Sequence, residues 1–210
     1  MVLSQVKDIF KGKYPKAKTR ITMDMRLKLR NIKCVFIVKN QLSSFLTKFS
    51  LRNKYYIFRL KNKICLTIYP KSKFKIQVTG IATNSDYNCL LTFFELNKIE
   101  VSEVQINNTF WIIKPLNIIH FDKFAKFCDL RRRKGKVNID LSNHGLNGDG
   151  GFLNAIYLRH SSCKGTIVIH RTSSLILGAT TLPAIRMLKL ELTKLLSDYI
   201  NYLELNTKRI

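Results

Sequence analysis

The chain has 210 residues, with 37 lysines and arginines against 13 aspartates and glutamates, so its formal net charge is +24. Hydrophobic residues make up 46% of it, enough to build the core of one large or two small domains, which argues against disorder. No apolar run approaches the roughly 18 residues of a membrane helix. The residues after Met1 contain no apolar segment as long as that of a signal peptide. Five scattered cysteines, an odd number, indicate reduced thiols. We therefore expect a soluble intracellular protein.

The positive charge is concentrated in the first part of the chain. Residues 1–80 carry 20 basic and 2 acidic residues, a net +18, whereas residues 81–210 carry 17 and 11, a net +6. Such a charge favours a polyanionic partner, with nucleic acid first and an anionic membrane surface or an acidic protein second. An A+T-rich genome also yields a chain rich in lysine, asparagine and isoleucine, but it does not explain the scarcity of acids in residues 1–80.

The first half reads as a basic arm followed by strands and a helix. Five lysines, with Gly12 and Pro15, indicate the arm over residues 1–18. Alternation of polar and apolar residues predicts strands at 20–29, 55–60, 64–69 and 74–79, the second and third forming a hairpin. A helix is plausible somewhere within the irregular apolar segment 32–48. Gly80 ends the last strand, and helical apolar spacing follows over residues 84–96.

The second half repeats this pattern. A strand is predicted at 105–113, a short helix at 120–128, and a basic loop at 131–136. A hairpin of strands 152–158 and 166–169 and a strand at 173–177, ended by Gly178, precede a long amphipathic helix over 183–200.

The two halves match each other in order and spacing. Residues 56–59 match 155–158, 65–69 match 166–169, and 77–83 match 175–181, at offsets close to 100 residues. Chance similarity between two apolar hairpins is the alternative explanation. A period this long is unlike that of a solenoid repeat. It predicts a duplicated α+β domain with two antiparallel sheets.

These motifs resemble the repeats of the TATA-box-binding protein family, in the divergent form carried by large DNA viruses. The segment 151–157 is similar to the family's Phe-Pro-Gly-Leu-Ile-Tyr, and both Val78-Thr79-Gly80 and Gly178-Ala179 are similar to its Thr-Gly-Ala. The resemblance implies an α+β, pseudo-twofold saddle with helices on its convex face. It divides the chain into an arm (1–19), a first repeat (20–103) and a second repeat (104–210).

The resemblance also implies DNA-binding residues, because that family kinks DNA with apolar wedges placed in the minor groove. Its paired phenylalanines correspond to Phe152 and Ile169 in the second repeat and to Tyr69 in the first, where 51–53 offers no aromatic partner. Its A·T-reading asparagine corresponds to Asn107, with no counterpart in the first repeat. These departures imply altered or lost TATA specificity. Packing in the sheet core is the alternative for each wedge residue. The other groove-facing positions implied by parity are Thr67, Gln77, Thr79, Ile167, Leu175 and Leu177.

No enzyme motif is found, so we expect neither catalytic residues nor a cofactor. A phosphate-binding glycine loop is absent. His160, Cys163 and His170 have no second ligand pair at zinc spacing. A nuclease site is a weak alternative, and its candidate residues are Asp122, Asp129, Asp140, His144 and Asp149.

The function predicted from the sequence is that of a DNA-binding transcription initiation factor. Its expected partners are double-stranded DNA, RNA polymerase subunits and a factor resembling transcription factor IIB. Binding to a membrane is not expected. Its expected location is the nucleus, or a viral factory or virion. Two alternatives remain: a non-specific nucleic-acid-binding structural protein, and an accessory domain of a nucleic-acid enzyme.

Overall fold

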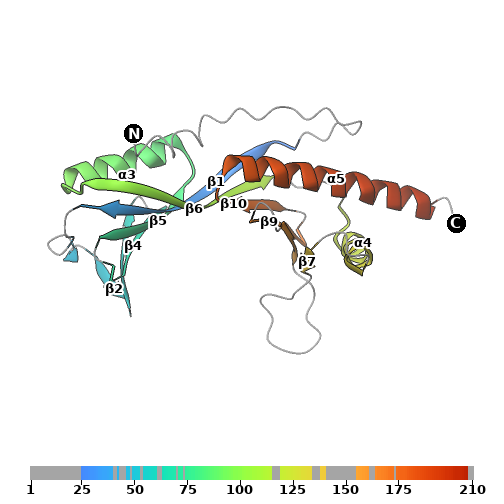
Figure 1. Cartoon of the computed structure of the whole chain (residues 1–210), viewed down its shortest axis with the longest axis horizontal. Helices are drawn as coiled ribbons and strands as arrows, with labels where there is room; N and C mark the ends of the chain where they lie inside the picture. The colour runs from blue at the N-terminus through green and yellow to red at the C-terminus, as the bar shows by residue number, and fades with distance from the viewer. Residues whose placement is uncertain are drawn as a thin grey trace. The chain divides into compact units, whose positions relative to one another are not determined.

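The computed structural model (Figure 1) describes residues 25–39, 42, 46–47, 49–52, 54–60, 63–69, 71–72, 74–114, 119–133, 138–140, 155–160, 164–172 and 174–207. They divide into two compact units: described residues 29–110 form the first, and described residues 25–28 and 111–207 form the second. None of the helices in this part of the chain is both long enough and apolar enough to cross a membrane. The predicted arm 1–19 lies outside the described residues, as does Phe152.

The first unit is an antiparallel sheet with one helix, α3 (Asn84–Leu96), against it (Figure 1). The strand order is β2-β3-β4-β5-β1-β6. The strands are β1 (Leu27–Val38), β2 (Ser50–Arg52), β3 (Tyr55–Leu60), β4 (Ile64–Ile68), β5 (Lys75–Ile81) and β6 (Val101–Ile113). The boundary between the units falls inside β1 and β6, whose outer residues 27–28 and 111–113 count with the second unit.

Helix α3 covers one face of the first sheet. Thr83 caps it: its side chain accepts a hydrogen bond from the Asp86 amide, while the Asp86 carboxylate accepts one from the Thr83 amide, which is a complete capping box. Phe94 packs edge-on against Phe36 of β1 at 5.0 Å between ring centroids, and Phe93 stacks on Phe58 of β3, also at 5.0 Å. Successive strand residues point to opposite faces, so the residues between these lie on the other side of the sheet.

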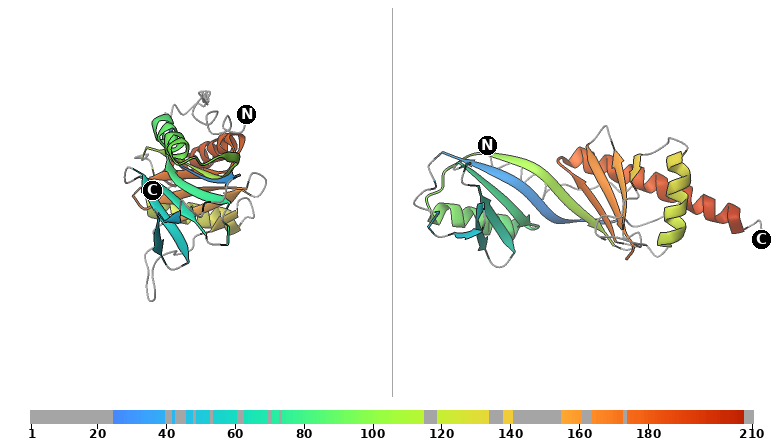
Figure 2. Two further views of the ribbon diagram at one scale, coloured as in Figure 1. Left: turned by 90° about the vertical axis from the view of Figure 1, so that its left-hand side faces the viewer. Right: turned by 90° about the horizontal axis from the view of Figure 1, so that it is seen from below.

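The second unit has the same plan (Figure 2). The sheet order is β10-β9-β8-β7, formed by β7 (Asn138–Asp140), β8 (Ala155–His160), β9 (Gly165–His170) and β10 (Leu175–Ala179). Helix α4 (Phe121–Arg133) precedes the strands, and the long helix α5 (Leu182–Thr207) follows them and lies against β9 and β10. A Cβ built on Gly165 would lie 2.7 Å from a methyl carbon of Leu188. The face of β9 that carries Gly165 is therefore packed directly on α5.

The two helices of the second unit are joined by aromatic packing and one ion pair. Tyr199 of α5 meets the ring of Phe124 of α4 edge-on at 4.9 Å between ring centroids. The Arg131 guanidinium of α4 also donates a hydrogen bond to the carboxylate of Asp198, the residue before Tyr199, and lies over the Phe127 ring. Arg131 is thus part of a helix and not of the predicted basic loop, of which residues 134–136 lie outside the described ranges.

Most predicted elements are present, and the order of strands and final helix occurs twice. The helix placed within 32–48 is wrong for residues 32–38, which form the end of β1. There Ile32, Cys34, Phe36 and Val38 are buried and their neighbours half-buried, so apolar residues on both faces hide the two-residue period. The short strands β2 and β7 were not predicted. The repeat boundary at 103/104 stays a prediction, since the compact units divide inside β6.

Candidate nucleic-acid interface

The face of the first sheet that lies opposite α3, called here the uncovered face, carries a continuous row of cross-strand neighbours. Its members are half-buried or exposed, whereas the residues beside them are buried toward α3 or half-buried on β1, β3, β4 and β5. On the edge strand β2 the neighbouring Leu51 is 62% exposed. The row runs through Val35 of β1, Gln77 of β5, Thr67 of β4, Ile57 of β3 and Ser50 of β2, each directly paired with the next. The sheet thus presents an alternation of apolar and hydrogen-bonding side chains.

Three predicted groove-facing residues lie on this face. Thr67 and Gln77 are direct cross-strand partners, and Thr79 is paired with Cys65 in the next row. All three are half-buried. The alternation of side chains along β4 and β5 therefore places all three on the uncovered face. Their contact with DNA stays a prediction.

Basic side chains accompany these rows. Arg59, the cross-strand partner of Cys65, is exposed. Lys33 shares the parity of Val35 and is half-buried, and Lys75, the partner of Ile37, is exposed. These cations give the uncovered face a positive charge, as binding to a phosphate backbone requires.

Tyr69 has an aromatic partner that the sequence did not reveal. Its ring centroid lies 5.8 Å from that of Tyr55 at a tilt of 56°, and 44% of Tyr69 is exposed. Both residues have the parity of the uncovered face, Tyr69 following Cys65 and Thr67, and Tyr55 preceding Ile57. The family's fixed spacing points to residues 51–53, which hold no aromatic side chain. The antiparallel pairing of β3 with β4 instead brings Tyr55 to the end of the hairpin where Tyr69 lies.

A β-bulge interrupts the pairing of β5 with β1. Ile32 is paired with Ile81 and Cys34 with Val78, so that Thr79 and Gly80 together oppose the single residue between Ile32 and Cys34. Gly80 has a φ of +92°, and a Cβ there would lie 2.1 Å from the Lys63 carbonyl oxygen, so only glycine fits. A bulge of this kind shifts the alternation of faces by one residue.

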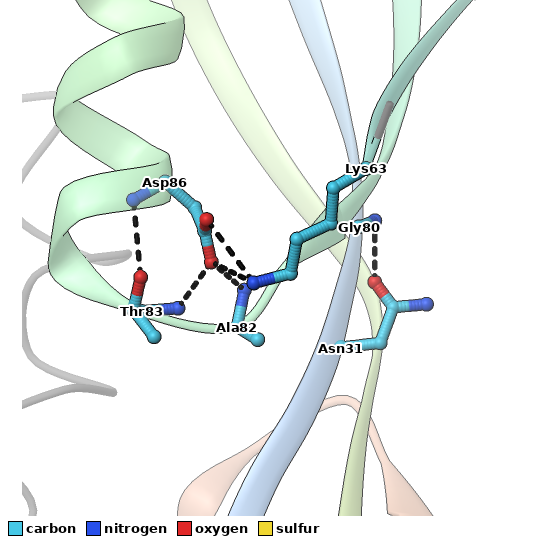
Figure 3. A network of polar contacts seen from close by, with 6 residues as sticks. All are labelled: Asn31, Lys63, Gly80, Ala82, Thr83 and Asp86. Carbon is cyan, nitrogen blue, oxygen red and sulfur yellow. Dashed lines mark hydrogen bonds and ion pairs between the residues drawn. The ribbon is translucent and has the colours of Figure 1, made fainter. Parts of the chain in front are cut away.

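Asn31 of β1 fills the space beside the bulge. Its Oδ1 accepts a hydrogen bond of 2.6 Å from the Gly80 amide (Figure 3). Asn31 is half-buried and immediately precedes the buried residues Ile32 and Cys34. The first unit therefore does carry an asparagine in its first strand, which the sequence analysis missed because it placed that strand at residues 20–29 and not at 27–38.

The bulge is tied to the start of α3 by a charged network (Figure 3). The Asp86 carboxylate accepts hydrogen bonds from the amides of Ala82 and Thr83, at 3.0 and 2.8 Å, and pairs with the Lys63 ammonium at 3.0 Å. Burial alone would raise the pKa of Asp86, but Lys63 and the hydrogen bonds from Ala82 and Thr83 outweigh it and lower the pKa below 3.8. Lys63 thereby holds the hairpin turn of β3 and β4 against the helix N-terminus.

The strand residues predicted to face DNA in the second repeat lie on the wrong face. Ile167 and Ile169 of β9 and Leu175 and Leu177 of β10 are 3% exposed or less. They share the parity of Gly165, which packs on α5. The prediction used the family's spacing, but four residues separate β8 from β9 and only three separate β3 from β4. Val168, and not Ile167, therefore has the cross-strand place that Thr67 has in the first unit.

The face of the second sheet opposite α5 carries other residues. Val168 is paired with Tyr157 of β8 and with Ile176 of β10, forming one row across three strands. At the end of β9, His170 is paired with Ala155, in the register that Tyr69 and Tyr55 occupy in the first unit. The aromatic pair of the first unit is thus not reproduced by these two positions.

Asn107, predicted as the base-reading asparagine, is exposed on β6 but has the parity of the buried Thr109 and Trp111. The adjacent Asn108 alternates with them and is half-buried, as Asn31 is before its own buried run. The Oδ1 atom of Asn108 is buried and has no hydrogen-bond partner. Asn108 thus resembles Asn31 in its place before a buried run, while contact of Asn107 with DNA stays a prediction.

No group of three or more metal-ligating side chains comes together among the residues that the structure describes. Of the residues weighed for zinc or nuclease chemistry, His144, Asp149 and Cys163 lie outside the described ranges. Asp122 is exposed and pairs with Arg171 at 2.8 Å. The carboxylate of Asp122 is thus paired with an arginine.

Comparison with known proteins supports the fold. No protein-family model and no curated protein sequence matches the chain. Among solved structures, the chain is similar to the TATA-box-binding protein (TBP) of Methanococcus jannaschii, with a TM-score of 0.59 at 12% identity over 82% of this chain and 99% of that chain. At this identity the similarity shows the fold alone. The predicted α+β fold with a duplicated antiparallel sheet, like that of TBP, is confirmed.

Proposed function

We propose that this protein binds double-stranded DNA through the uncovered face of its first sheet and the matching face of its second. The observation that carries the proposal is the Tyr55–Tyr69 pair, an exposed aromatic contact at the edge of a basic, hydrogen-bonding sheet surface. The other face of each sheet is filled by α3 or α5 and is not available to a ligand. The similarity in fold to a TBP supports the same assignment.

The proposed role of the tyrosine pair is to open a base step. Aromatic or apolar side chains inserted between base pairs from the minor groove unstack them, and the cost of a few kcal/mol is offset by the larger contact surface of the bent duplex. Tyr69 is exposed enough to enter a step, while Tyr55 supports its ring from the neighbouring strand. In the second repeat Phe152 remains the proposed wedge, without Ile169 as its partner because Ile169 is buried.

We place the protein in transcription initiation as a non-enzymatic factor, with altered or lost TATA specificity. RNA polymerase subunits or a factor resembling transcription factor IIB would then dock on the outer surfaces of α3 and α5. These helices expose Leu96, Met187 and Leu190, with Arg186, Glu191 and Lys194 beside the last two. Recovery of such proteins with the tethered full chain would support initiation. Recovery of neither from native extract would contradict it.

The DNA-binding proposal is tested by measuring bending directly. A duplex with fluorophores at both ends is titrated with the full chain, and the energy transfer between the ends is recorded. Bending predicts a rise in transfer at saturation that survives an increase in salt as long as the complex persists. Saturable binding without any change in transfer would favour the alternative of a non-specific structural protein that uses charge alone.

A further inference from the structure

The exposed ring of Tyr69 belongs to a turn that is fixed by hydrogen bonds. The Tyr69 carbonyl accepts a hydrogen bond of 2.8 Å from the Ser72 amide, and the Ser72 carbonyl accepts one of 2.9 Å from the Lys75 amide at the start of β5. The ring also contacts that of Tyr55, with the centroids 5.8 Å apart. Tyr69 is therefore positioned by the backbone and by a neighbouring ring, while 44% of it stays exposed.

The hydroxyl of a tyrosine affects which bases its ring can contact at low cost. Full insertion between two base pairs takes the hydroxyl out of water, which costs free energy unless it finds a hydrogen-bond partner. Insertion also has to unstack the two base pairs. An unpaired base, in contrast, stacks on one side of the ring and leaves the hydroxyl in water. The same ring therefore meets an unpaired base without either cost.

We infer that Tyr69, supported by Tyr55, is a stacking site for an unpaired base, so that the protein also binds single-stranded DNA along the uncovered face. This goes beyond the proposed bending of a duplex, because the site requires neither a duplex nor a bend. Proteins that bind single strands combine aromatic side chains, on which the bases stack, with cations that contact the phosphates.

The side chains next to the tyrosine pair suit the edge of an unpaired base. Ile57 and Thr67 form the next row of the sheet, two residues and about 7 Å further along each strand, and Gln77 is paired with Thr67. A hydroxyl and an amide can each donate and accept hydrogen bonds. They can therefore bind the Watson–Crick edge of a base, which is accessible only when the base is unpaired.

Exposed cations lie before and after these rows. Lys71 is in the turn that begins at Tyr69, and Arg59 is paired with Cys65, one row beyond Thr67. Both side chains are exposed. A single strand that follows β3 and β4 would meet one cation, the aromatic ring, the hydrogen-bonding row and the second cation in turn. The uncovered face thus offers contacts for both the phosphates and the bases of one strand.

The test compares oligothymidine with a strand of the same length that is abasic throughout. Both have about 12 nucleotides, within the range that single-strand-binding folds cover, and both carry the same phosphate charge. At high salt, which weakens phosphate contacts, the full chain should bind oligothymidine at least about fivefold more tightly than the abasic strand. Tyr69→Ala should lose this difference and Tyr69→Phe should keep it. Phe74→Ala, which removes a ring that is 42% exposed, should also keep it.

Photochemical crosslinking locates the stacked base without any variant. Oligothymidine with 5-iodouracil in place of some thymines is irradiated in the complex, and the protein is digested with trypsin. The peptide 64–71, in which Tyr69 is the one aromatic residue, should carry the crosslink. Crosslinks confined to other peptides would overturn the inference.

Equal wild-type affinity for oligothymidine and the abasic strand would overturn the inference as well. So would a difference that survives Tyr69→Ala in a protein of unchanged thermal melting. Bending of a labelled duplex is measured separately from these affinities. A protein that bends the duplex but binds both single strands alike would therefore refute the inference and leave the proposed function standing, and the reverse result would refute only the proposed bending.

Discussion

The ring centroids of Tyr55 and Tyr69 lie 5.8 Å apart on the uncovered face of the first sheet, because the antiparallel pairing of β3 with β4 brings the two residues together. The contact costs little to remove from the folded state, because Tyr69 is 44% exposed and aromatic pairs add only about 0.5–1.5 kcal/mol beyond area burial. The contact between the two tyrosines therefore adds little to the stability of the core.

Truncating Tyr69 should separate DNA bending from folding. Tyr69→Ala removes the proposed wedge, so end-to-end energy transfer in a bound duplex should fall while the thermal melting temperature changes by only a few degrees. Phe74→Ala is the matched control, since Phe74 is 42% exposed and lies just before β5. If Phe74→Ala reduced bending as much as Tyr69→Ala, the tyrosine pair would have no special role.

The burial of Ile169 predicts a stability effect and not a binding effect. Ile169→Ala should lower the free energy of unfolding by about 2–5 kcal/mol, because it leaves a cavity under α5. Val168→Ala, one residue earlier on the opposite face, should cost about 1 kcal/mol or less. Denaturant unfolding measures the loss of unfolding free energy in both variants. A larger loss for Val168→Ala would mean that the faces of β9 are assigned the wrong way round.

The faces of the second sheet show where sequence reasoning succeeded and where it failed. The hairpin strands and the helix after Gly80 follow from local patterns of apolar residues. The faces of residues 167–177 could not be derived from the family's spacing, because the connection between β8 and β9 holds one residue more than that between β3 and β4, which changes the alternation of faces. Asn31 and Tyr55 were missed for a related reason. Their roles depend on cross-strand partners, Gly80 and Tyr69, that a linear spacing does not reveal.

The ionised Asp86 should stabilise the fold at neutral pH and lose that effect in acid. Its pKa is below 3.8 in the folded protein, so its contribution is fully present above the unfolded pKa and is lost as pH falls through the folded pKa. The loss should therefore occur as pH falls below the ordinary carboxyl pKa of 3.8. Asp86→Asn should remove this part of the pH dependence and cost about 0.5–2 kcal/mol at pH 7 as a weakened cap.

Asp122→Asn is the control for that measurement. Asp122 pairs with Arg171 at the surface, with side chains 70% and 41% exposed, and such pairs contribute about 0–1 kcal/mol. Denaturant unfolding at pH 7 and pH 3 compares the two variants with the wild type. An identical pH dependence for Asp86→Asn and the wild type would show that the network around Lys63 does not stabilise the ionised carboxylate.

DNA affinity should fall steeply with salt because of the +24 net charge, with a slope of several units in a plot of log affinity against log salt. Arg59→Gln, on the uncovered face, should reduce that slope by about one. Arg186→Gln on the outer surface of α5 should leave it nearly unchanged. A slope near zero for the wild type would refute the electrostatic part of the account.

The most direct test of the central claim uses the protein's own cysteines as reporters. Cys65 lies on the uncovered face between Arg59 and Thr79, and Cys89 lies on α3, on the other side of the first sheet; both are half-buried. Burial raises the pKa of Cys34 to about 12, and burial, opposed by Arg131, raises that of Cys128 to about 12, so neither thiol should react.

Alkylation of the full chain with and without duplex DNA, followed by peptide mass mapping, measures each cysteine separately. The account predicts that DNA slows modification of Cys65 several-fold and leaves Cys89 unchanged. Unaltered reactivity of Cys65 in the saturated complex, or protection of Cys89 in its place, would show that DNA does not bind this face.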